Sequence, residues 1–310
     1  MTGGAGFIGS HVVASLVRDY HVRVLDNLFA GKRENVPIGV ELLVGDITNR
    51  DDVHQAMQGI DRVVHLAALR SVPQSIKDMV GYADKNVTGT TMICDEALKA
   101  KVKRVVSISS SSVYGEGAPL PLKEGHEAEL KSPYAGAKFA AEIMARVAGS
   151  MGLDVVSLRY FNVFGPRQDP TGDYATFIPR TILNLVNGER QIIHEDGEQT
   201  RDFNPVANTV FGTRQALFSP RKFRGEAFNI ASGKPHSVNE VYAFAREFVA
   251  KYVPSAANVE PIRTGVVRTG DIRDTAADLT NAEEVLSYKP VQSFEDGLSE
   301  TVDYFCQRSI

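Results

Sequence analysis

A tyrosine and a lysine four residues apart are the side chains in this sequence best suited to chemistry. Tyr134 and Lys138 lie in a segment whose pattern predicts a helix, so both side chains leave the same helix face. Because an ammonium beside a phenol favours the phenolate, we expect Lys138 to lower the pKa of Tyr134 and make it a base near neutral pH. Ser132 and Pro133 mark the predicted start of this helix.

Four serines precede this helix in the chain. Residues 109–112, in "SISSSSVYG", follow an apolar strand-like run. Ligands of α/β proteins bind at the carboxyl ends of parallel strands, so a hydroxyl group here is expected to hold a substrate alcohol against Tyr134. A Y-x-x-x-K pair or a serine run is common by itself, and only their order in the chain makes the combination specific.

The chain begins with a glycine-rich turn. "GAGFIG" satisfies G-x-G-x-x-G at Gly4, Gly6 and Gly9, and a helical pattern follows at once. Asp26 ends the next strand-like run, at the spacing expected of a carboxylate that binds an adenosine ribose. The sequence therefore predicts a dinucleotide whose pyrophosphate lies over the N-terminus of the helix.

Two points at this turn stay open from the sequence. Asp26 repels a 2′-phosphate and favours NAD, whereas Lys32 and Arg33 nearby keep NADP as an alternative. Only Met1 and Thr2 precede the turn, so we expect the strand that normally leads into it to be missing and its neighbours to keep unpaired backbone groups.

Alternating strand and helix patterns fill the first half of the chain. Apolar strands separated by helices indicate a parallel sheet covered on both faces. The strands are expected within 21–26, 40–48, 61–68, 103–115 and 153–165, and the helices within 9–20, 50–60, 86–102 and 132–148. His65 within the third strand is expected to be a core histidine. The predicted fold is α/β, a doubly wound Rossmann-like parallel sheet with a smaller C-terminal α/β cap.

Composition excludes several classes of protein. The chain has 310 residues, a formal net charge of −4 and a pI near 6.0, which argues against binding to nucleic acid or an anionic membrane. Cys94 and Cys306 lack the spacing of a zinc site or a disulfide scaffold. No apolar run approaches the length of a bilayer span and no signal-like segment is present, so we expect a cytoplasmic protein without metal.

The motifs together resemble a known family. TGGAGFIG, LDNL, GDIT, HLAA, NVTGT, SSSSVYG, SPYAGAK, RYFNVFGPRQDP, GEQTRDF, FNIASG and RTGD occur in this order along nearly the whole chain. In this respect it resembles the extended short-chain dehydrogenases/reductases and, within them, the NAD-dependent epimerase/dehydratase family of the UDP-glucose (or UDP-N-acetylglucosamine) 4-epimerase type. The resemblance implies an NAD-binding domain over 1–164, to which 203–232 returns, and a mainly nucleotide-sugar-binding domain over 165–310.

The resemblance also implies a reaction. Tyr134 would remove the proton of the sugar 4-hydroxyl while hydride passes to NAD, and the 4-keto sugar would turn over before the hydride returns to its other face. Lys138 would bind the nicotinamide ribose, and Ser110 fills the catalytic Ser/Thr position. The expected partners are a UDP-sugar and a second copy of the chain, joined through the helices that begin near Tyr82 and carry Tyr134.

The resemblance assigns two sets of contacts. For NAD these are Gly3, Gly6, Phe7, Ile8, Gly9, Asp26, Asn27, Asp46, Ile47, Leu66, Ala67, Ala68, Arg70, Asn86, Tyr134, Lys138 and Phe161, the last covering the nicotinamide. For the nucleotide-sugar they are Ser110, Ser112, Asn162, Arg201, Arg268, Asp271 and Thr275. The arginines suit a diphosphate, which a planar cation binds through two parallel hydrogen bonds.

Three positions separate this chain from related enzymes. Nucleotide-sugar 4,6-dehydratases resemble T-D-E-V-Y-G, whereas this chain has Ser111 and Ser112 in place of the acid and base. UDP-glucuronate decarboxylases have a glutamate at the position of Ser112, so neither reaction is expected. Thr275 is small where the family varies residue size beside the sugar, which favours tolerance of N-acetylated hexoses such as UDP-GlcNAc.

One segment departs from the family pattern. "NPVANTV" follows "TRDF", and Pro205, Ala207 and Asn208 replace a backbone donor and carboxylates. This departure predicts an altered local structure or an altered substrate position. A dehydrogenase or reductase with net redox change, or a non-catalytic NAD-binding protein, therefore remains an alternative to the epimerase.

Overall fold

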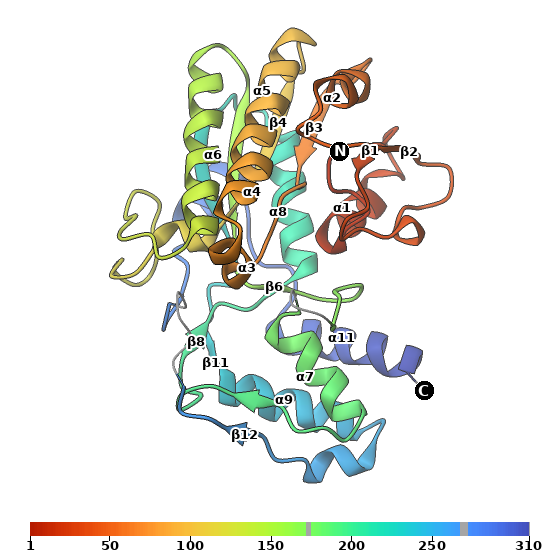
Figure 1. Ribbon diagram of the computed structural model, residues 1–310, viewed down its shortest axis with the longest axis vertical. Coiled ribbons are helices and arrows are strands. Elements are labelled where there is room, and N and C mark those ends of the chain that lie inside the picture. Colours follow the sequence, from red (N-terminus) through yellow and green to blue (C-terminus); the bar gives the residue numbers. More distant parts are fainter. Residues whose placement is uncertain (172–174, 267–271, 310) are drawn as a thin grey trace.

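The computed structural model describes residues 1–171, 175–266 and 272–309. Its centre is a parallel sheet that runs through the upper part of Figure 1. Every strand pair of this sheet is parallel, which confirms the predicted Rossmann-like fold. From one edge to the other the order is β2 (Glu41–Val44), β1 (Arg23–Asp26), the residue Thr2, β3 (Arg62–His65), β4 (Arg104–Ser110), β5 (Val155–Tyr160) and β10 (Arg224–Ile230).

Thr2 lies at the position of the expected central strand, between β1 and β3. Its backbone forms parallel bridges to Leu25 and to His65, and the N-terminus in Figure 1 lies between these strands. The Thr2 N–H donates to Val64 O at 3.0 Å, and the Leu66 N–H donates to Thr2 O at 3.2 Å. The expectation of unpaired backbone groups beside the glycine turn is therefore wrong, because Thr2 pairs there with both neighbouring strands.

Helices cover both faces of the sheet. Val12, Ala216 and Leu286 pack with strand residues on one face, and Val53, Ile93 and Ala145 pack with strand residues on the other. The helices of the first face are α1 (Phe7–Leu16), α8 (Val206–Phe218) and α10 (Thr280–Leu286); those of the second are α2 (Arg50–Met57), α5 (Gly89–Lys99) and α6 (Pro133–Ser150).

Helix α6 begins where the sequence predicts. Pro133 takes the first helical position, and the Ser132 hydroxyl accepts a hydrogen bond from the Ala135 N–H at 3.2 Å. Short helical segments lie in the connections of this domain. η1 (Arg33–Asn35) lies between β1 and β2, η3 (Ser111–Tyr114) follows β4, and three segments lead from β3 to α5: α3 (Val72–Lys77), α4 (Met79–Ala83) and η2 (Asp84–Thr88).

The lower part of Figure 1 is the cap, which has a core of its own. Ile182, Val241 and Val302 meet there, one from each of three helices. These helices are α7 (Phe177–Val186), α9 (Val238–Ala250) and α11 (Phe294–Ser309), with η4 (Pro254–Asn258) after α9. Pairs of short strands lie outside the central sheet: β6 (Val163–Phe164) with β9 (Asn204–Pro205), β7 (Ile192–Ile193) with β12 (Ile262–Arg263), and β8 (Thr200–Arg201) with β11 (His236–Ser237).

The chain returns from the cap to the sheet twice. Phe228 to Ile230, expected to rejoin the sheet, lie in β10 and pair with β5. Helix α10 also packs on the sheet, although it lies within the range assigned mainly to the substrate domain.

The "NPVANTV" segment forms regular structure in spite of its departure from the family pattern. Asn208 is fully buried, and its amide nitrogen donates to Asn204 Oδ1 and Gln292 O. Its amide oxygen accepts from the backbone N–H groups of Val291 and Gln292. A carboxylate could not make the first two bonds, so asparagine suits this position.

The structure also bears on membrane spans and disulfides. No helix in the described ranges is both long enough and apolar enough to span a bilayer. Cys94 and Cys306 are buried, and neither forms a disulfide.

Candidate active site

The glycine turn leaves room for a ligand on one side only. A Cβ atom on Gly9 would lie 2.0 Å from Gly3 O, and one on Gly3 would lie 2.7 Å from Ala67 N. Gly3 also has a φ of +69°, which favours glycine. A Cβ on Gly6 would have Gly3 O as its nearest neighbour, at 3.4 Å, so this face of the turn is open. The turn thus has the form of a pyrophosphate cradle at the start of α1.

Asp26 fixes the same turn from the end of β1. One carboxylate oxygen accepts from the Ala5 N–H and the other from the Leu28 N–H, each at 2.9 Å. The carboxylate retains lone pairs beside the turn, as a ribose contact requires.

Asn27 and Asp46 meet next to Asp26. Asn27 Nδ2 donates to Asp46 at 3.1 Å, and Lys85 Nζ lies 3.1 Å from both oxygens of the same carboxylate. Although burial alone would raise it, hydrogen bonds from Thr48, Lys85 and Asn27 lower the pKa of Asp46 to about 2. An ionised acceptor therefore stands at the predicted adenosine end of the site, whereas the neighbouring Ile47 points into the core.

The segment after β3 is held by side chains from two other elements. Asn86 accepts from the Leu69 N–H at 2.8 Å and donates to Leu69 O at 3.0 Å, so its amide supports the backbone of this segment. The Ala67 N–H donates to Thr2 Oγ1. Leu66, Ala68 and Arg70 in turn line the main cavity, together with Phe7 and Ile8 from the start of α1.

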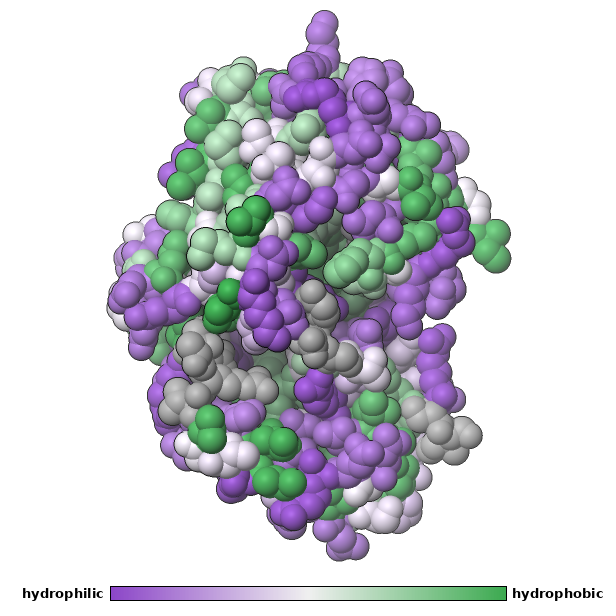
Figure 2. Space-filling view, in the orientation of Figure 1, coloured by the Kyte–Doolittle hydropathy of each residue, from purple (hydrophilic) through white to green (hydrophobic). Residues whose placement is uncertain are grey.

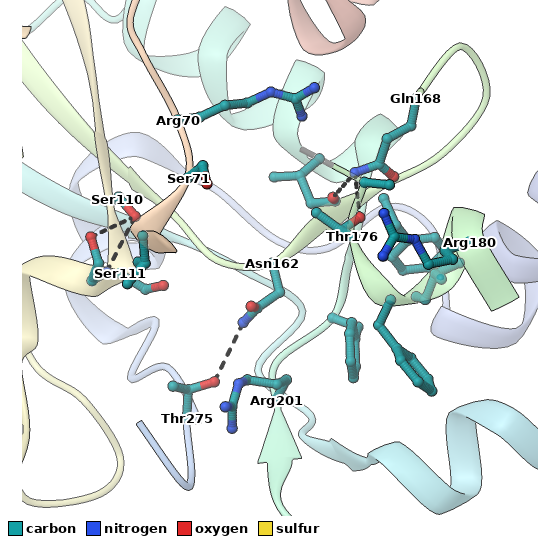
Figure 3. A pocket seen from close by; sticks show the side chains of 18 of the residues that line it. Arg70, Ser71, Ser110, Ser111, Asn162, Gln168, Thr176, Arg180, Arg201 and Thr275 are labelled. Atoms are coloured by element: carbon teal, nitrogen blue, oxygen red, sulfur yellow. Dashed lines mark hydrogen bonds between the residues drawn. The ribbon is translucent and has the colours of Figure 1, made fainter. Parts of the chain in front are cut away.

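The three predicted catalytic residues line one cavity of about 670 Å³ between the sheet domain and the cap. Tyr134 is hydrogen-bonded to Ser110. Lys138, which is 7% exposed, donates from Nζ to Ile108 O at 2.9 Å. Ser112 Oγ donates to Ser110 Oγ at 3.0 Å, so the serine hydroxyls form a chain that ends at the tyrosine. Figure 3 shows Ser110 and Ser111 on one side of this cavity.

The pKa of Tyr134 shifts in the direction opposite to the one predicted. Burial raises the pKa of Tyr134, and the hydrogen bond to Ser110 and the positive charge of Arg70 offset this only in part. Lys138 is itself buried and bonded to a backbone carbonyl, and burial lowers its pKa to about 8. Without a bound ligand, the phenol of Tyr134 is therefore protonated at neutral pH.

Phe161 and Tyr160 are neighbours in the chain but differ in whether they line the cavity. Phe161 is fully buried against Tyr114 in a different cluster and does not line the cavity, so a nicotinamide-covering ring is a wrong prediction for it. Its neighbour Tyr160 lines the cavity instead, because successive strand residues face opposite sides of a sheet.

His65 is a core histidine, as expected. Burial, Lys138 and the N-terminus lower its pKa to about 3.

The substrate end of the cavity brings together three predicted residues. Asn162, Arg201 and Thr275 all line it (Figure 3), and Asn162 Nδ2 donates to Thr275 Oγ1 at 3.4 Å. Arg201 donates from Nη1 to Thr200 O and to Arg273 O. The other two predicted residues, Arg268 and Asp271, lie outside the described residues.

Two further residues shape this end, and the sequence analysis assigns neither a role. The buried carboxylate of Asp202 accepts from the Ser232 N–H and hydroxyl and from the N–H groups of Gly233 and Ala277, while the Asp202 N–H donates to Thr275 Oγ1. Gln168 donates to Val163 O and Thr176 Oγ1 and leaves its buried Oε1 as an unpaired acceptor at the cavity wall (Figure 3). Asp202 belongs to the motif "TRDF", and a carboxylate between aromatic and basic residues is its only local signal.

With this geometry in view, the comparison with known families is decisive. The sequence model of the NAD dependent epimerase/dehydratase family matches residues 1–231. The chain belongs to this family. Its cofactor is therefore NAD, and the glycine cradle, Asp26 and the catalytic cavity fit that group.

The relatives in this family share its size but differ in reaction. The chain is 33% identical to a UDP-N-acetyl-alpha-D-glucosaminuronate decarboxylase of Bacillus cytotoxicus, over 98% of this chain and 96% of the relative. A UDP-glucose 4-epimerase of Thermotoga maritima, solved with UDP-glucose, superimposes with a TM-score of 0.93 at 33% identity, covering 100% of this chain and 98% of that one. A UDP-N-acetylglucosamine 4-epimerase of Methanobrevibacter ruminantium, solved with UDP-N-acetylmuramic acid, gives 0.91 at 36% identity, covering 99% and 97%.

A single methyl group on Gly9 tests the NAD cradle. We expect Gly9→Ala to lose bound NAD and to lower the melting temperature, because the new Cβ collides with Gly3 O at 2.0 Å. The NAD content of the purified protein and thermal unfolding measure the two effects. Gly136→Ala is the matched control, since its Cβ meets nothing within 4 Å on helix α6. Normal NAD content in Gly9→Ala would contradict the assignment of the cradle.

Proposed function

We propose that this protein is an NAD-dependent UDP-sugar 4-epimerase that interconverts UDP-glucose and UDP-galactose. The observation that carries the proposal is the contact of Tyr134 with Ser110 beside Lys138 in a cavity that also reaches the glycine turn. A phenol hydrogen-bonded to a serine hydroxyl is suited to exchange a proton with a sugar hydroxyl held in the same place.

The residues around Tyr134 favour epimerisation over dehydration or decarboxylation. Among the described residues that line the cavity, Glu195 is the single carboxylate, and it forms an ion pair with Arg273 at 3.0 Å. Ser111 and Ser112 stand where an elimination would need an acid and a base. Serine hydroxyls are much weaker acids and bases than carboxyl groups at neutral pH, so these residues favour oxidation and reduction of an alcohol over loss of water.

Each residue then has a role in the proposed reaction. Tyr134 takes the proton of the sugar 4-hydroxyl, Ser110 orients that hydroxyl, and the Lys138 ammonium stabilises the phenolate. NAD, when bound, supplies the hydride acceptor and returns the hydride, so no net oxidation occurs. Arg201 at the other end is suited to bind the diphosphate of the nucleotide-sugar.

Removal of the phenolic hydroxyl tests the assigned base. We expect Tyr134→Phe to reduce kcat by about 10²–10⁴-fold while NAD stays bound, because the proton acceptor is lost without loss of the cradle. The assay follows UDP-glucose, UDP-galactose, UDP-GlcNAc and UDP-GalNAc without added NAD. Interconversion by the unaltered protein supports the epimerase, net oxidation that requires added NAD indicates a dehydrogenase, and no reaction indicates a non-catalytic protein. Full turnover in Tyr134→Phe would contradict the role of the tyrosine.

We also propose that the protein accepts N-acetylated UDP-hexoses. Thr275 is a small side chain at the cavity wall, and its hydroxyl is bonded to Asp202 and Asn162. One of the similar structures is named a UDP-N-acetylglucosamine 4-epimerase.

A larger side chain at position 275 tests this proposal. We expect Thr275→Tyr to lower kcat/KM for UDP-GlcNAc on the order of tenfold or more and to spare UDP-glucose, since the ring takes the space of the acetamido group. Thr275→Ser keeps the hydroxyl and serves as the control. An equal loss on both sugars in Thr275→Tyr would refute the size argument.

A second copy of the chain is the proposed partner, bound at an apolar face of α4 and α6. Ile143, Val147 and Met151 follow one another at helical spacing and are exposed, as are Met79 and Val80 on α4. Figure 2 shows hydrophobic atoms gathered over this side of the upper part of the molecule. Contiguous exposed apolar residues of this kind are typical of protein interfaces.

A charge in the middle of this face tests the dimer. We expect Val147→Glu to convert a dimer to a monomer in size-exclusion chromatography with light scattering, because the interface would bury an unpaired carboxylate. Val291→Glu changes an equally exposed valine elsewhere and is the control. A monomeric unaltered protein, or a dimeric Val147→Glu variant, would contradict this face as the interface.

A further inference from the structure

A buried ion cluster lies behind the catalytic helix, outside the cavity. Arg159 on β5 is 1% exposed and binds the Glu142 carboxylate of α6 with two hydrogen bonds, Nε to Oε1 at 3.0 Å and Nη2 to Oε2 at 2.7 Å. The same guanidinium forms an ion pair with Glu127, at 2.5 Å. Glu142 is 3% exposed, so this pair is shielded from water.

The cluster touches each element that carries a catalytic group. Glu142 lies on α6 with Tyr134 and Lys138, and Glu127 lies in the segment that connects η3 to α6. The ring of Tyr114, at the end of η3, lies 4.8 Å from the guanidinium carbon. Arg159 itself pairs in register with Ser109 on β4. One guanidinium thus joins β5, α6 and the segment after the catalytic serines.

Lys138 is the catalytic group with most need of such support. Its Nζ donates to a neutral carbonyl, Ile108 O, and in the described part of the chain no carboxylate lies within ion-pair distance of it. His65 from β3 faces it but stays neutral. A buried ammonium with these neighbours is costly unless a negative charge lies close by.

We propose that Glu142 is a positioning residue for Lys138: held rigidly by Arg159 one helical turn beyond the lysine, it supplies the negative charge that keeps the buried ammonium protonated and in place beside Tyr134. This inference rests on the catalytic role of Lys138 in the proposed function. Glu142 acts through Lys138 and touches no ligand. The two hydrogen bonds from Arg159 fix the direction of the carboxylate.

The electrostatics around Lys138 give the sign of the effect. Glu142 of α6 and His65 of β3 are the groups that interact with it, and Arg159 of β5 lies behind Glu142. Burial lowers the pKa of Lys138 to about 8, and Glu142 opposes this shift. Loss of the Glu142 charge therefore lowers the pKa further. Since lysine is charged below its pKa, the ammonium would then be lost at a lower pH.

The titration of Lys138 tests this inference directly. The whole chain with bound NAD and ¹³Cε-labelled lysine is titrated by NMR, with Lys138 assigned through Lys138→Arg, and the pH profile of kcat is measured in parallel. In Glu142→Gln we expect the midpoint of Lys138 and the alkaline limit of kcat to fall by about one pH unit or more, as for a unit charge one helical turn away. Glu142→Asp keeps the charge, and we expect it to titrate as the unaltered protein does.

Glu127→Gln is the matched control, because it removes a carboxylate from the same guanidinium but from a different element. We expect it to leave the Lys138 midpoint in place. An unmoved midpoint in Glu142→Gln, or equal shifts in all three variants, would overturn the proposal and leave a purely structural cluster. If Glu142→Gln does not fold, Glu142→Met removes the same charge while Arg159 keeps its ion pair with Glu127, and it must show the lowered midpoint.

The two readouts separate this inference from the proposed function. A shifted midpoint in a protein that turns over no UDP-sugar supports the role of Glu142 and refutes the epimerase. An unshifted midpoint in an active epimerase does the reverse.

Discussion

Lys138 extends from the second turn of α6 into the sheet, where its ammonium reaches the carbonyl of Ile108 and little water reaches the ammonium. This placement holds only while α6 stays at a fixed distance from β4, because a hydrogen bond of 2.9 Å tolerates little displacement. Three contacts hold α6 in this position: the Ser132 cap, the contact of Tyr134 with Ser110, and the bonds of Arg159 to Glu142. The end of the cavity that holds Tyr134 is therefore organised around one buried lysine.

Burial also decides the direction of the pKa shift of Tyr134. It raises the pKa of the phenol more than the hydrogen bond to Ser110 and the positive charge of Arg70 lower it. In the proposed reaction, a ligand that brings positive charge or hydrogen-bond donors to the phenol would lower this pKa and favour the phenolate.

Local signals in the sequence predict the frame of this site well, and distant packing decides the rest. The start of α6, the glycine turn and the order of strands follow from caps, glycine and apolar periodicity, which involve neighbouring residues. The pKa of Tyr134 depends on burial by elements far apart in the chain, so spacing alone gives the wrong sign. The roles of Phe161 and Tyr160 depend on which side of β5 each faces, which a shared motif does not resolve. Thr2 completes the sheet with a single residue, too short a stretch for any periodicity to reveal.

The carboxylate of Asp202 has a consequence for how substrates fit. It accepts four hydrogen bonds, from the segment that leaves β10 and from Ala277, so the sheet domain and the substrate end share one buried group. Opening this end as a hinge would strip a buried carboxylate of its donors, which is costly. Under the proposed function, the side chains that line this end, Thr275 among them, would therefore decide which UDP-sugar fits.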